Sequence, residues 1–215
     1  MLLYSCYVCW MVGGERMIGP REMLDPEALV ILLIGASAVG KSSLAVKLYE
    51  AGIVEPQPTW ATRKPRPGET DTYYDHLFVT DEAFDTQSRI GGFLAEEPLY
   101  KARYGVPFLH KPADGLEALM VLKPVFIPRF KAYYRNTRVY QIDASPEVLP
   151  ERMRARGQSE AEIATRMREY EQEVASARRF ADVTFDNNGL LSETYSQVEA
   201  QIYLDKEAHQ IARAT

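Results

Sequence analysis

Cysteine, histidine and long apolar runs are scarce in this chain of 215 residues, and each shortage excludes a class of protein. The histidines His76, His110 and His209 are scattered, which indicates neither a metal site nor a catalytic triad. No run of about 18 apolar residues occurs, so we expect no membrane span. Both cysteines lie before residue 10, so the remainder is free of cysteine and a reducing cytoplasm is the expected location.

Positive charge is in short supply as well. The chain has 25 Lys and Arg against 30 Asp and Glu, a formal net charge of −5. Surfaces that bind nucleic acid are usually basic overall, so we expect no nucleic-acid partner. With 46% hydrophobic residues, the chain has enough apolar material for one core, which predicts a single domain carrying a small insertion.

The first two dozen residues differ from the rest in composition. Residues 1–12 are apolar and aromatic but lack the basic start and the small-residue cleavage site of a signal peptide. Cys6 and Cys9 have the C-x-x-C spacing of some redox and zinc motifs, yet no second pair completes a zinc site. We expect residues 1–24 to form an N-terminal extension of unclear role and residues 25–208 to form the functional domain.

The most informative motif that is present is Gly35–Ser42, which fits the phosphate-loop pattern G-x-x-x-x-G-K-[ST] at every fixed position. The apolar run 29–34 predicts a buried parallel strand before it, and residues 42–50 predict the helix whose N-terminus favours phosphate. The sequence therefore predicts ATP binding, with Ser42 as a ligand of Mg²⁺. The residues expected to bind the nucleotide are Gly35, Ser37, Ala38, Val39, Gly40, Lys41, Ser42 and Ser43.

Strands and helices alternate along most of the chain, which predicts a three-layer α/β P-loop fold with a central, mostly parallel sheet. Strands are expected at 119–122, 137–143 and 183–185, a helical turn at 114–119, and helices at 128–135, 146–156 (capped by Ser145), 160–179 and 190–207. Residues 56–107 break this alternation and predict a small β-rich insertion. Within it we expect a strand at 76–80, a helix at 82–90 capped by Asp81, and short strands between 93 and 107.

A second motif, T-R-K-P-R-P-G-E at 62–69, places two arginines three residues apart between prolines. Guanidinium groups suit bidentate contact with phosphate. Taken alone, however, the segment is more typical of a solvated basic loop.

Together the two motifs resemble the guanylate kinase family, and the similarity covers roughly residues 28–205. The resemblance implies transfer of phosphate from ATP and Mg²⁺ to a small acceptor, most often GMP, beneath a helical lid at 150–180. Lys41 and Ser42 would hold the ATP phosphates and Mg²⁺, while Arg152, Arg156 and Arg166 would close over the transferring group. For the lid arginines, helix-surface pairs such as Glu162–Arg166 are the alternative reading. The expected acceptor-binding residues are Arg63, Arg66, Glu69, His76, Glu96, Tyr104 and Lys123.

Several positions depart from the family pattern. The expected glutamate is Ala95, with Glu96 beside it as the candidate replacement, and the serine expected after Tyr104-Gly105 is Val106. The aspartate expected at the end of the second buried strand is absent, and Lys123 stands there. Losing these polar groups weakens discrimination between bases. Two alternatives therefore stay open: a kinase resembling ribose 1,5-bisphosphate phosphokinase, and a non-catalytic binding module. A monomer and a homo-oligomer are both compatible with the sequence.

Overall fold

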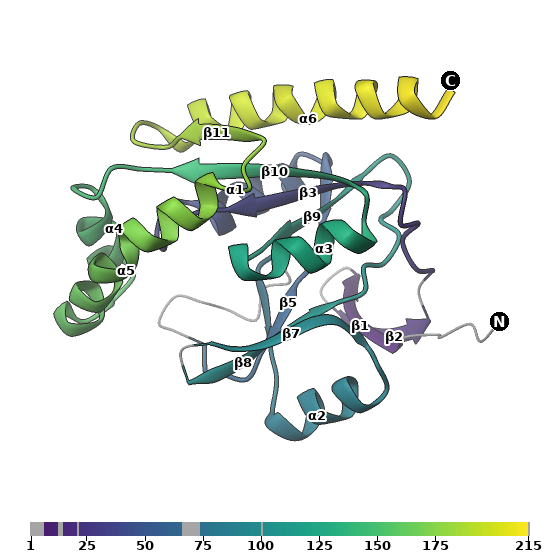
Figure 1. Cartoon of the computed structure of the whole chain (residues 1–215), viewed down its shortest axis with the longest axis horizontal. Helices are drawn as coiled ribbons and strands as arrows, with labels where there is room; N and C mark the ends of the chain where they lie inside the picture. Colours follow the sequence, from purple (N-terminus) through teal and green to yellow (C-terminus); the bar gives the residue numbers. More distant parts are fainter. Residues whose placement is uncertain (1–6, 13–14, 21, 66–73, 100, 215) are drawn as a thin grey trace.

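The computed structural model describes residues 7–12, 15–20, 22–65, 74–99 and 101–214. Its larger sheet has five parallel strands in the order β11-β10-β3-β9-β4 (Figure 1). The strands are β3 (Leu29–Ile34), β4 (Val54–Pro56), β9 (Glu117–Val121), β10 (Asn136–Asp143) and β11 (Val183–Asp186). The predicted α/β fold with a mostly parallel central sheet is confirmed.

The central strand β3 is buried on both faces, which explains its unbroken apolar sequence. On one face Leu29, Ile31 and Leu33 belong to a core with the helices α1 (Lys41–Glu50) and α6 (Leu191–Ala214). On the other face Val30 and Leu32 pack in a second core. That core contains the 3₁₀ turn η1 (Pro124–Phe126), the helix α3 (Ile127–Tyr133) and part of the smaller sheet.

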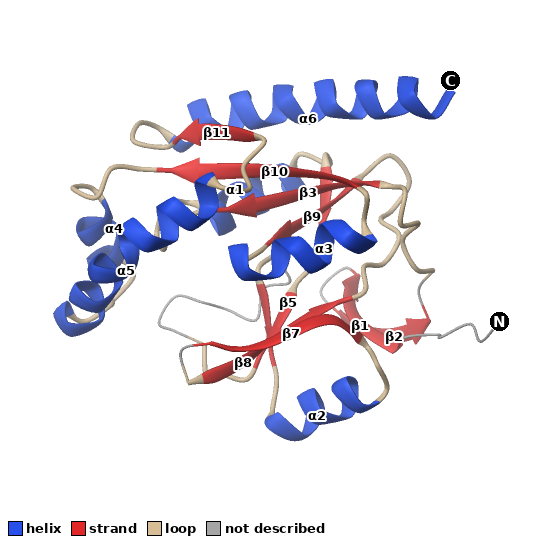
Figure 2. Cartoon of the chain, in the orientation of Figure 1, coloured by secondary structure: helices blue, strands red, loops and turns tan. Residues whose placement is uncertain are grey.

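The smaller sheet has four strands in the order β6-β5-β8-β7 and lies below the larger sheet in Figure 2. They are β5 (Thr59–Ala61), β6 (His76–Phe78), β7 (Phe93–Leu99) and β8 (Ala102–Pro107). The helix α2 (Asp81–Arg89) packs on this sheet through Phe84, whose ring centroid lies 4.6 Å from that of Phe93. Ala61, Ala95, Tyr104 and Val106 turn inward to the second core, so the sheet forms a wall facing the end of β3.

Two helices, α4 (Leu149–Ala155) and α5 (Glu160–Arg178), form an arm beside the sheet. A capping box opens α5, because the Ser159 side chain accepts a hydrogen bond from the Glu162 N–H and the Glu162 side chain accepts one from the Ser159 N–H. Farther along α5, Val174 belongs to the first core and Ala177 to the second. The carboxyl half of α5 is therefore anchored in both cores.

Several predicted boundaries are wrong. The helix α4 begins at Leu149 rather than Pro146, because residues 145–148 form a turn in which the Val148 N–H donates to the Ser145 carbonyl. Thr80, not Asp81, caps α2, since its hydroxyl accepts from the Ala83 N–H at 3.2 Å.

Other elements are longer than predicted or were not predicted at all. β9 begins at Glu117, inside the expected turn, and α6 continues to Ala214. The short strand β4 was missed. In the expected extension, β1 (Tyr7–Val12) pairs antiparallel with β2 (Glu15–Pro20). Within the described part of the chain, no helix is both long enough and apolar enough to cross a membrane.

Candidate active site

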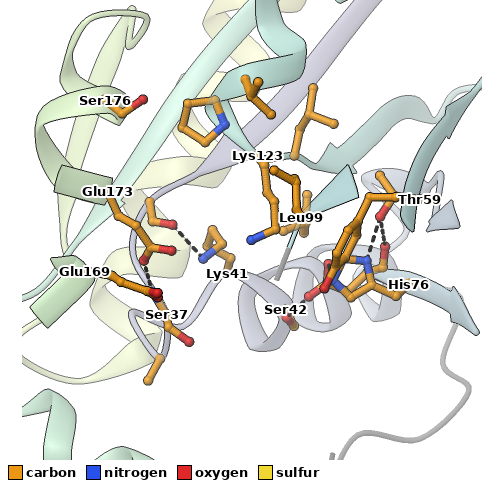
Figure 3. A pocket seen from close by; sticks show the side chains of 18 of the residues that line it. Ser37, Lys41, Ser42, Thr59, His76, Leu99, Lys123, Glu169, Glu173 and Ser176 are labelled. Atoms are coloured by element: carbon orange, nitrogen blue, oxygen red, sulfur yellow. Dashed lines mark hydrogen bonds and ion pairs between the residues drawn. The ribbon is translucent and has the colours of Figure 1, made fainter. Parts of the chain in front are cut away.

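A cavity of about 400 Å³ lies where the carboxyl ends of β3 and β9 meet the smaller sheet and α5 (Figure 3). Its lining brings together most of the residues that the sequence predicts for the site. They are Gly35, Ser37, Ala38, Gly40, Lys41, Ser42, Arg63, His76, Tyr104, Lys123, Arg156 and Arg166. One space thus contains the phosphate loop, part of the smaller sheet and the helical arm.

The phosphate loop needs its two glycines for steric reasons. Gly35 has φ +140°, and a Cβ there would lie 2.2 Å from the Ile142 carbonyl oxygen. Gly40 has φ +104°, and a Cβ would lie 2.4 Å from Nδ2 of Asn187. The same Asn187 amide donates to the Val39 carbonyl at 2.7 Å, which ties the loop to the end of β11. The loop is therefore held closely against the neighbouring strands.

Lys41 lies at the centre of the cavity and is held by its own loop. Its Nζ donates to the Gly35 carbonyl at 3.0 Å and to the Ala36 carbonyl at 2.7 Å. Burial lowers the pKa of the Lys41 ammonium group, Asp75 and Glu173 raise it in part, and Arg156 and Arg166 lower it again. A half-buried cation whose charged form is disfavoured gains stability from an anion, so this position is suited to bind phosphate.

Two carboxylates contact the phosphate loop on either side of Lys41. Oε2 of Glu173, on α5, accepts a hydrogen bond from the Ser37 N–H at 3.1 Å. Oδ2 of Asp75, just before β6, accepts one from the Ser42 hydroxyl at 2.7 Å. In Figure 3 Glu173 and Ser42 lie on opposite sides of Lys41. The contact of Glu173 shows that the Ser37 N–H can bind an anion. The contact of Asp75 places a carboxylate beside the Ser42 hydroxyl, and both are oxygen groups of the kind that bind Mg²⁺.

The residues present fit a nucleotide-bound Mg²⁺ rather than a metal caged by protein. Among the described residues, no group of three or more His, Cys, Asp or Glu side chains could hold a metal ion. Mg²⁺ in phosphoryl-transfer sites usually takes only one or two protein ligands and completes its shell with water and phosphate oxygens.

The wall formed by the smaller sheet is polar and rich in cations. Nε of Arg63 donates to the Tyr104 hydroxyl at 3.1 Å, and its guanidinium carbon lies 4.8 Å from the centre of the Phe78 ring. Nδ1 of His76 lies 2.6 Å from the Thr59 hydroxyl. Nζ of Lys123 enters from the end of β9 and lies 5.6 Å from the centre of the Tyr104 ring. These groups face the phosphate loop across the cavity and are suited to an anionic second ligand.

The chain is similar in sequence to proteins of known family. No family model matches it. A guanylate kinase of Syntrophus aciditrophicus is 31% identical over 169 residues, which cover 76% of this chain and 81% of that protein. A guanylate kinase of Synechocystis sp. is 33% identical over 170 residues, covering 70% of this chain and 82% of that protein. The chain belongs to the guanylate kinase family.

Other comparisons agree with the family and add a second kind of relative. The crystal structure of guanylate kinase from Anaplasma phagocytophilum superposes with a TM-score of 0.59 at 20% identity, covering 86% of this chain and 89% of that one, which supports the fold. A ribose 1,5-bisphosphate phosphokinase of Pseudofrankia inefficax is 30% identical over 182 residues, covering 82% of this chain and 91% of that protein. This guanylate kinase family member is a phosphotransferase of the nucleoside monophosphate kinase type.

Some residues predicted for the site of this guanylate kinase family member lie outside the cavity. Glu96 is exposed, accepts from the Ser88 hydroxyl at 2.8 Å and lies 3.8 Å from Arg103. Its neighbour Ala95 is the residue that turns inward, because successive side chains of a strand point to opposite faces. The structure therefore does not bring Glu96 to the position of the expected acid.

Arg152 also lies outside the cavity lining, since its Nη2 donates to the Asn187 carbonyl at 2.8 Å and so supports the loop that contacts Gly40. Val39 and Ser43 flank Lys41 in the loop and the first helical turn but are not part of the lining. Arg66 and Glu69 lie outside the described residues.

The sequence did not single out Asp75, Glu173 or Thr59, although all three line the cavity. Glu173 could have been found, because it follows Arg166 by seven residues and so shares its face of the predicted helix. Asp75 carried no such signal, since it reaches the phosphate loop only through the folding of the smaller sheet.

Proposed function

We propose that this chain transfers the γ-phosphoryl group of ATP, bound with Mg²⁺, to the phosphate group of a small acceptor, with GMP as the leading candidate. One observation carries the proposal: a single cavity contains the phosphate loop with Lys41 on one side and the Arg63–Tyr104 pair on the other. Phosphoryl transfer requires alignment and charge neutralisation more than covalent chemistry, and this arrangement supplies both.

In this proposal the phosphate loop binds the donor. Lys41 exchanges its contacts with the loop carbonyls for the outer phosphates of ATP, and the Ser37 N–H exchanges the Glu173 carboxylate for a phosphate oxygen. Mg²⁺ would be held by Ser42 and would neutralise charge on the β- and γ-phosphates. Each exchange replaces a contact within the protein by one with a more highly charged ligand, which favours binding.

The lid arginines have a matching role. Arg156 and Arg166 line the cavity from α5 and the segment before it, and both lower the pKa of Lys41, so their charge acts at the centre of the site. We assign them to neutralising the transferring group and to excluding water, which would otherwise accept the phosphate. Arg152 then acts indirectly, by holding the Asn187 carbonyl.

A second acceptor class is favoured by the changed wall of the smaller sheet. Ala95 and Val106 are buried and apolar, Glu96 faces outward, and Lys123 brings a positive charge into the cavity. A site with fewer groups for a base edge and one more cation suits a sugar that carries a second phosphate. The relative that is a ribose 1,5-bisphosphate phosphokinase makes ribose 1,5-bisphosphate the natural compound to compare.

A coupled assay of ADP formation with Mg-ATP tests the proposal, with GMP, dGMP, AMP, UMP and ribose 1,5-bisphosphate as acceptors. Turnover with GMP that exceeds turnover with every other acceptor supports the first candidate. Turnover confined to ribose 1,5-bisphosphate supports the second and overturns the first. ADP release that does not depend on any of these acceptors contradicts both.

A further inference from the structure

Among the described residues, no strand of the larger sheet ends in an acid that lines the cavity, although a Mg-nucleotide site usually has one there. In phosphate-loop enzymes the metal is held by the hydroxyl of the loop and by an aspartate. Here β9 ends in Val121, followed by Leu122 and Lys123, so this strand end contributes a cation. Asp143, at the end of β10, lies outside the cavity lining and interacts with the Ala144 N–H and with Arg178.

A carboxylate reaches the loop hydroxyl from the other sheet instead. Oδ2 of Asp75 accepts the hydrogen bond of Ser42 at 2.7 Å. The second oxygen, Oδ1, is buried and accepts no hydrogen bond from the part of the chain that the structure describes. Nε2 of His76 lies 3.4 Å from this oxygen. A buried carboxylate oxygen with unused acceptor capacity beside the Mg²⁺-binding serine is a favourable contact for a cation or its bound water.

The backbone around Asp75 is held in place independently of its side chain. The Asp75 carbonyl accepts from the Thr59 N–H at 3.0 Å and from the Thr59 hydroxyl at 3.2 Å. The next residue, His76, pairs with Thr59 in the parallel register of β5 and β6. The carboxylate is therefore presented to Ser42 by a fixed strand end, which lowers the entropy cost of ordering it around a metal.

The other acids of the cavity are placed differently. Glu169 and Glu173 both belong to α5, and Glu173 contacts the Ser37 N–H, an anion-binding group. Figure 3 shows both on the side of Lys41 that is opposite Ser42. Asp75 is thus the carboxylate that meets the metal-binding hydroxyl, while Glu173 occupies a position suited to a phosphate oxygen.

We propose that Asp75 positions the Mg²⁺ of the bound nucleotide together with Ser42, in place of an aspartate at a strand end. The inference rests on the proposed use of a Mg-nucleotide. It places the metal-orienting acid on the smaller sheet, next to His76 and Thr59, so the wall that faces the acceptor also holds the metal of the donor. Asp75 is in this sense a positioning residue rather than a group that contacts the transferring phosphate.

Calorimetric titration with ADP, with and without Mg²⁺, tests this role without turnover. Asp75→Asn keeps the shape and an acceptor for Ser42 but removes the charge. We expect it to lower the gain in ADP affinity that Mg²⁺ confers by about 10-fold or more, the usual effect of removing an outer-sphere partner of a metal. Affinity for metal-free ADP should stay unchanged or rise, because a negative charge near Lys41 is removed. Asp75→Glu should retain part of the metal effect.

Asp81→Asn is the matched control, since Asp81 is an exposed aspartate in the first turn of α2 and lies outside the cavity lining. It should bind ADP and Mg-ADP as the wild type does. Mn²⁺ in place of Mg²⁺ gives a second readout, because its electron paramagnetic resonance spectrum with ADP should change in Asp75→Asn and not in Asp81→Asn.

An equal Mg²⁺ effect in wild type and Asp75→Asn, with equal Mn²⁺ spectra, overturns the role of Asp75. If Mg²⁺ does not change the ADP affinity of the wild type, the result contradicts the proposed Mg-nucleotide donor itself rather than the role of Asp75. Thermal unfolding of each variant separates loss of folding from loss of metal. If Asp75→Asn unfolds early, Asp75→Glu is compared with the wild type instead. A smaller Mg²⁺ effect and a changed Mn²⁺ spectrum in Asp75→Glu support the role of Asp75, and values equal to those of the wild type overturn it.

Discussion

The two walls of the cavity are built in different ways. The proposed donor wall is one continuous segment, Gly35–Ser42, whose geometry is set by its own backbone and by the strand and helix that flank it. The facing wall is assembled from separate strands, with Thr59 on β5, His76 on β6, Tyr104 on β8 and Lys123 after β9. A continuous loop is hard to alter without losing function, whereas single side chains on separate strands can change one at a time. This difference agrees with a donor half that fits the phosphate-loop pattern at every fixed position and an acceptor half in which the resemblance led us to expect departures.

The largest effect is expected on the donor wall. Lys41→Ala removes the half-buried cation at the centre of the site and should lower kcat by about 10³-fold, because charge stabilisation in the transition state is lost. The fold should survive, since Leu44 and Leu48, not Lys41, anchor α1 in the core. Steady-state kinetics and circular dichroism check both statements. Lys47 is an exposed lysine on the same helix, so Lys47→Ala is the control and should leave kcat unchanged. Retained turnover in Lys41→Ala would contradict the assignment of the donor wall.

Arg63→Ala tests the facing wall. A hydrogen bond to a charged group contributes roughly 1.5–3 kcal/mol, so the KM for the acceptor should rise about 10- to 100-fold. The KM for ATP should change little, because Arg63 lies across the cavity from the phosphate loop. Lys64→Ala, at the exposed neighbouring position, provides the control. If the KM for ATP changes and the KM for the acceptor does not, the assignment of the two walls to donor and acceptor is reversed.

Glu173→Gln examines a group that contacts the donor wall in the free protein. Removing the carboxylate from the Ser37 N–H should tighten ATP binding several-fold at neutral pH, since a competing anion is lost. The hydrogen bond between Glu173 and the Ser37 N–H contributes about 1 kcal/mol, which sets the size of the expected change. Isothermal titration measures the change. An unchanged or weaker affinity would show that Glu173 does not compete with phosphate.

The same variant has a defined pH dependence. The pKa of Lys41 is lowered in the free protein and should rise when phosphate binds, so ATP affinity is full below the free-protein pKa and falls as pH rises through it. Glu173 raises that pKa in part. Its loss should move the alkaline decline in affinity to lower pH, and a decline at the wild-type pH would contradict this coupling.

The smallest effect is expected at Glu96. Its side chain faces Ser88 and Arg103 on the outer side of the smaller sheet, so Glu96→Gln should change the acceptor KM by less than about 2-fold. A larger change would mean that Glu96 reaches the acceptor and would restore it as the replacement for the missing acid.

The success of the sequence-based predictions also differs between the two walls. The strand, loop and helix of the donor wall were predicted nearly to the residue, because short-range sterics and a long apolar run determine them. The choice between Ala95 and Glu96 depends on which face of β7 turns inward, and that is decided by pairing with β8. Asp75 meets Ser42 across 33 positions of the chain, a contact that no local pattern indicates. The start of α4 was misplaced because a turn at Ser145 satisfies the same backbone groups as a helix cap.

The anchoring of α5 also determines how the arm can move. Its carboxyl half is held in two separate cores by Val174 and Ala177, whereas its amino half enters only the first core, through Ile163, so we expect the arm to rotate about the end that is held twice. At 1.5 Å per residue, Glu173 lies about 6 Å along the helix from Ala177, whereas Arg166 lies about 16 Å away. A given rotation therefore carries the arginine more than twice as far as the glutamate. In the proposed mechanism such a rotation would carry Arg166 toward the phosphates while Glu173 moves less than half as far, so the arriving nucleotide, rather than the movement of the arm, would have to displace the carboxylate from the loop.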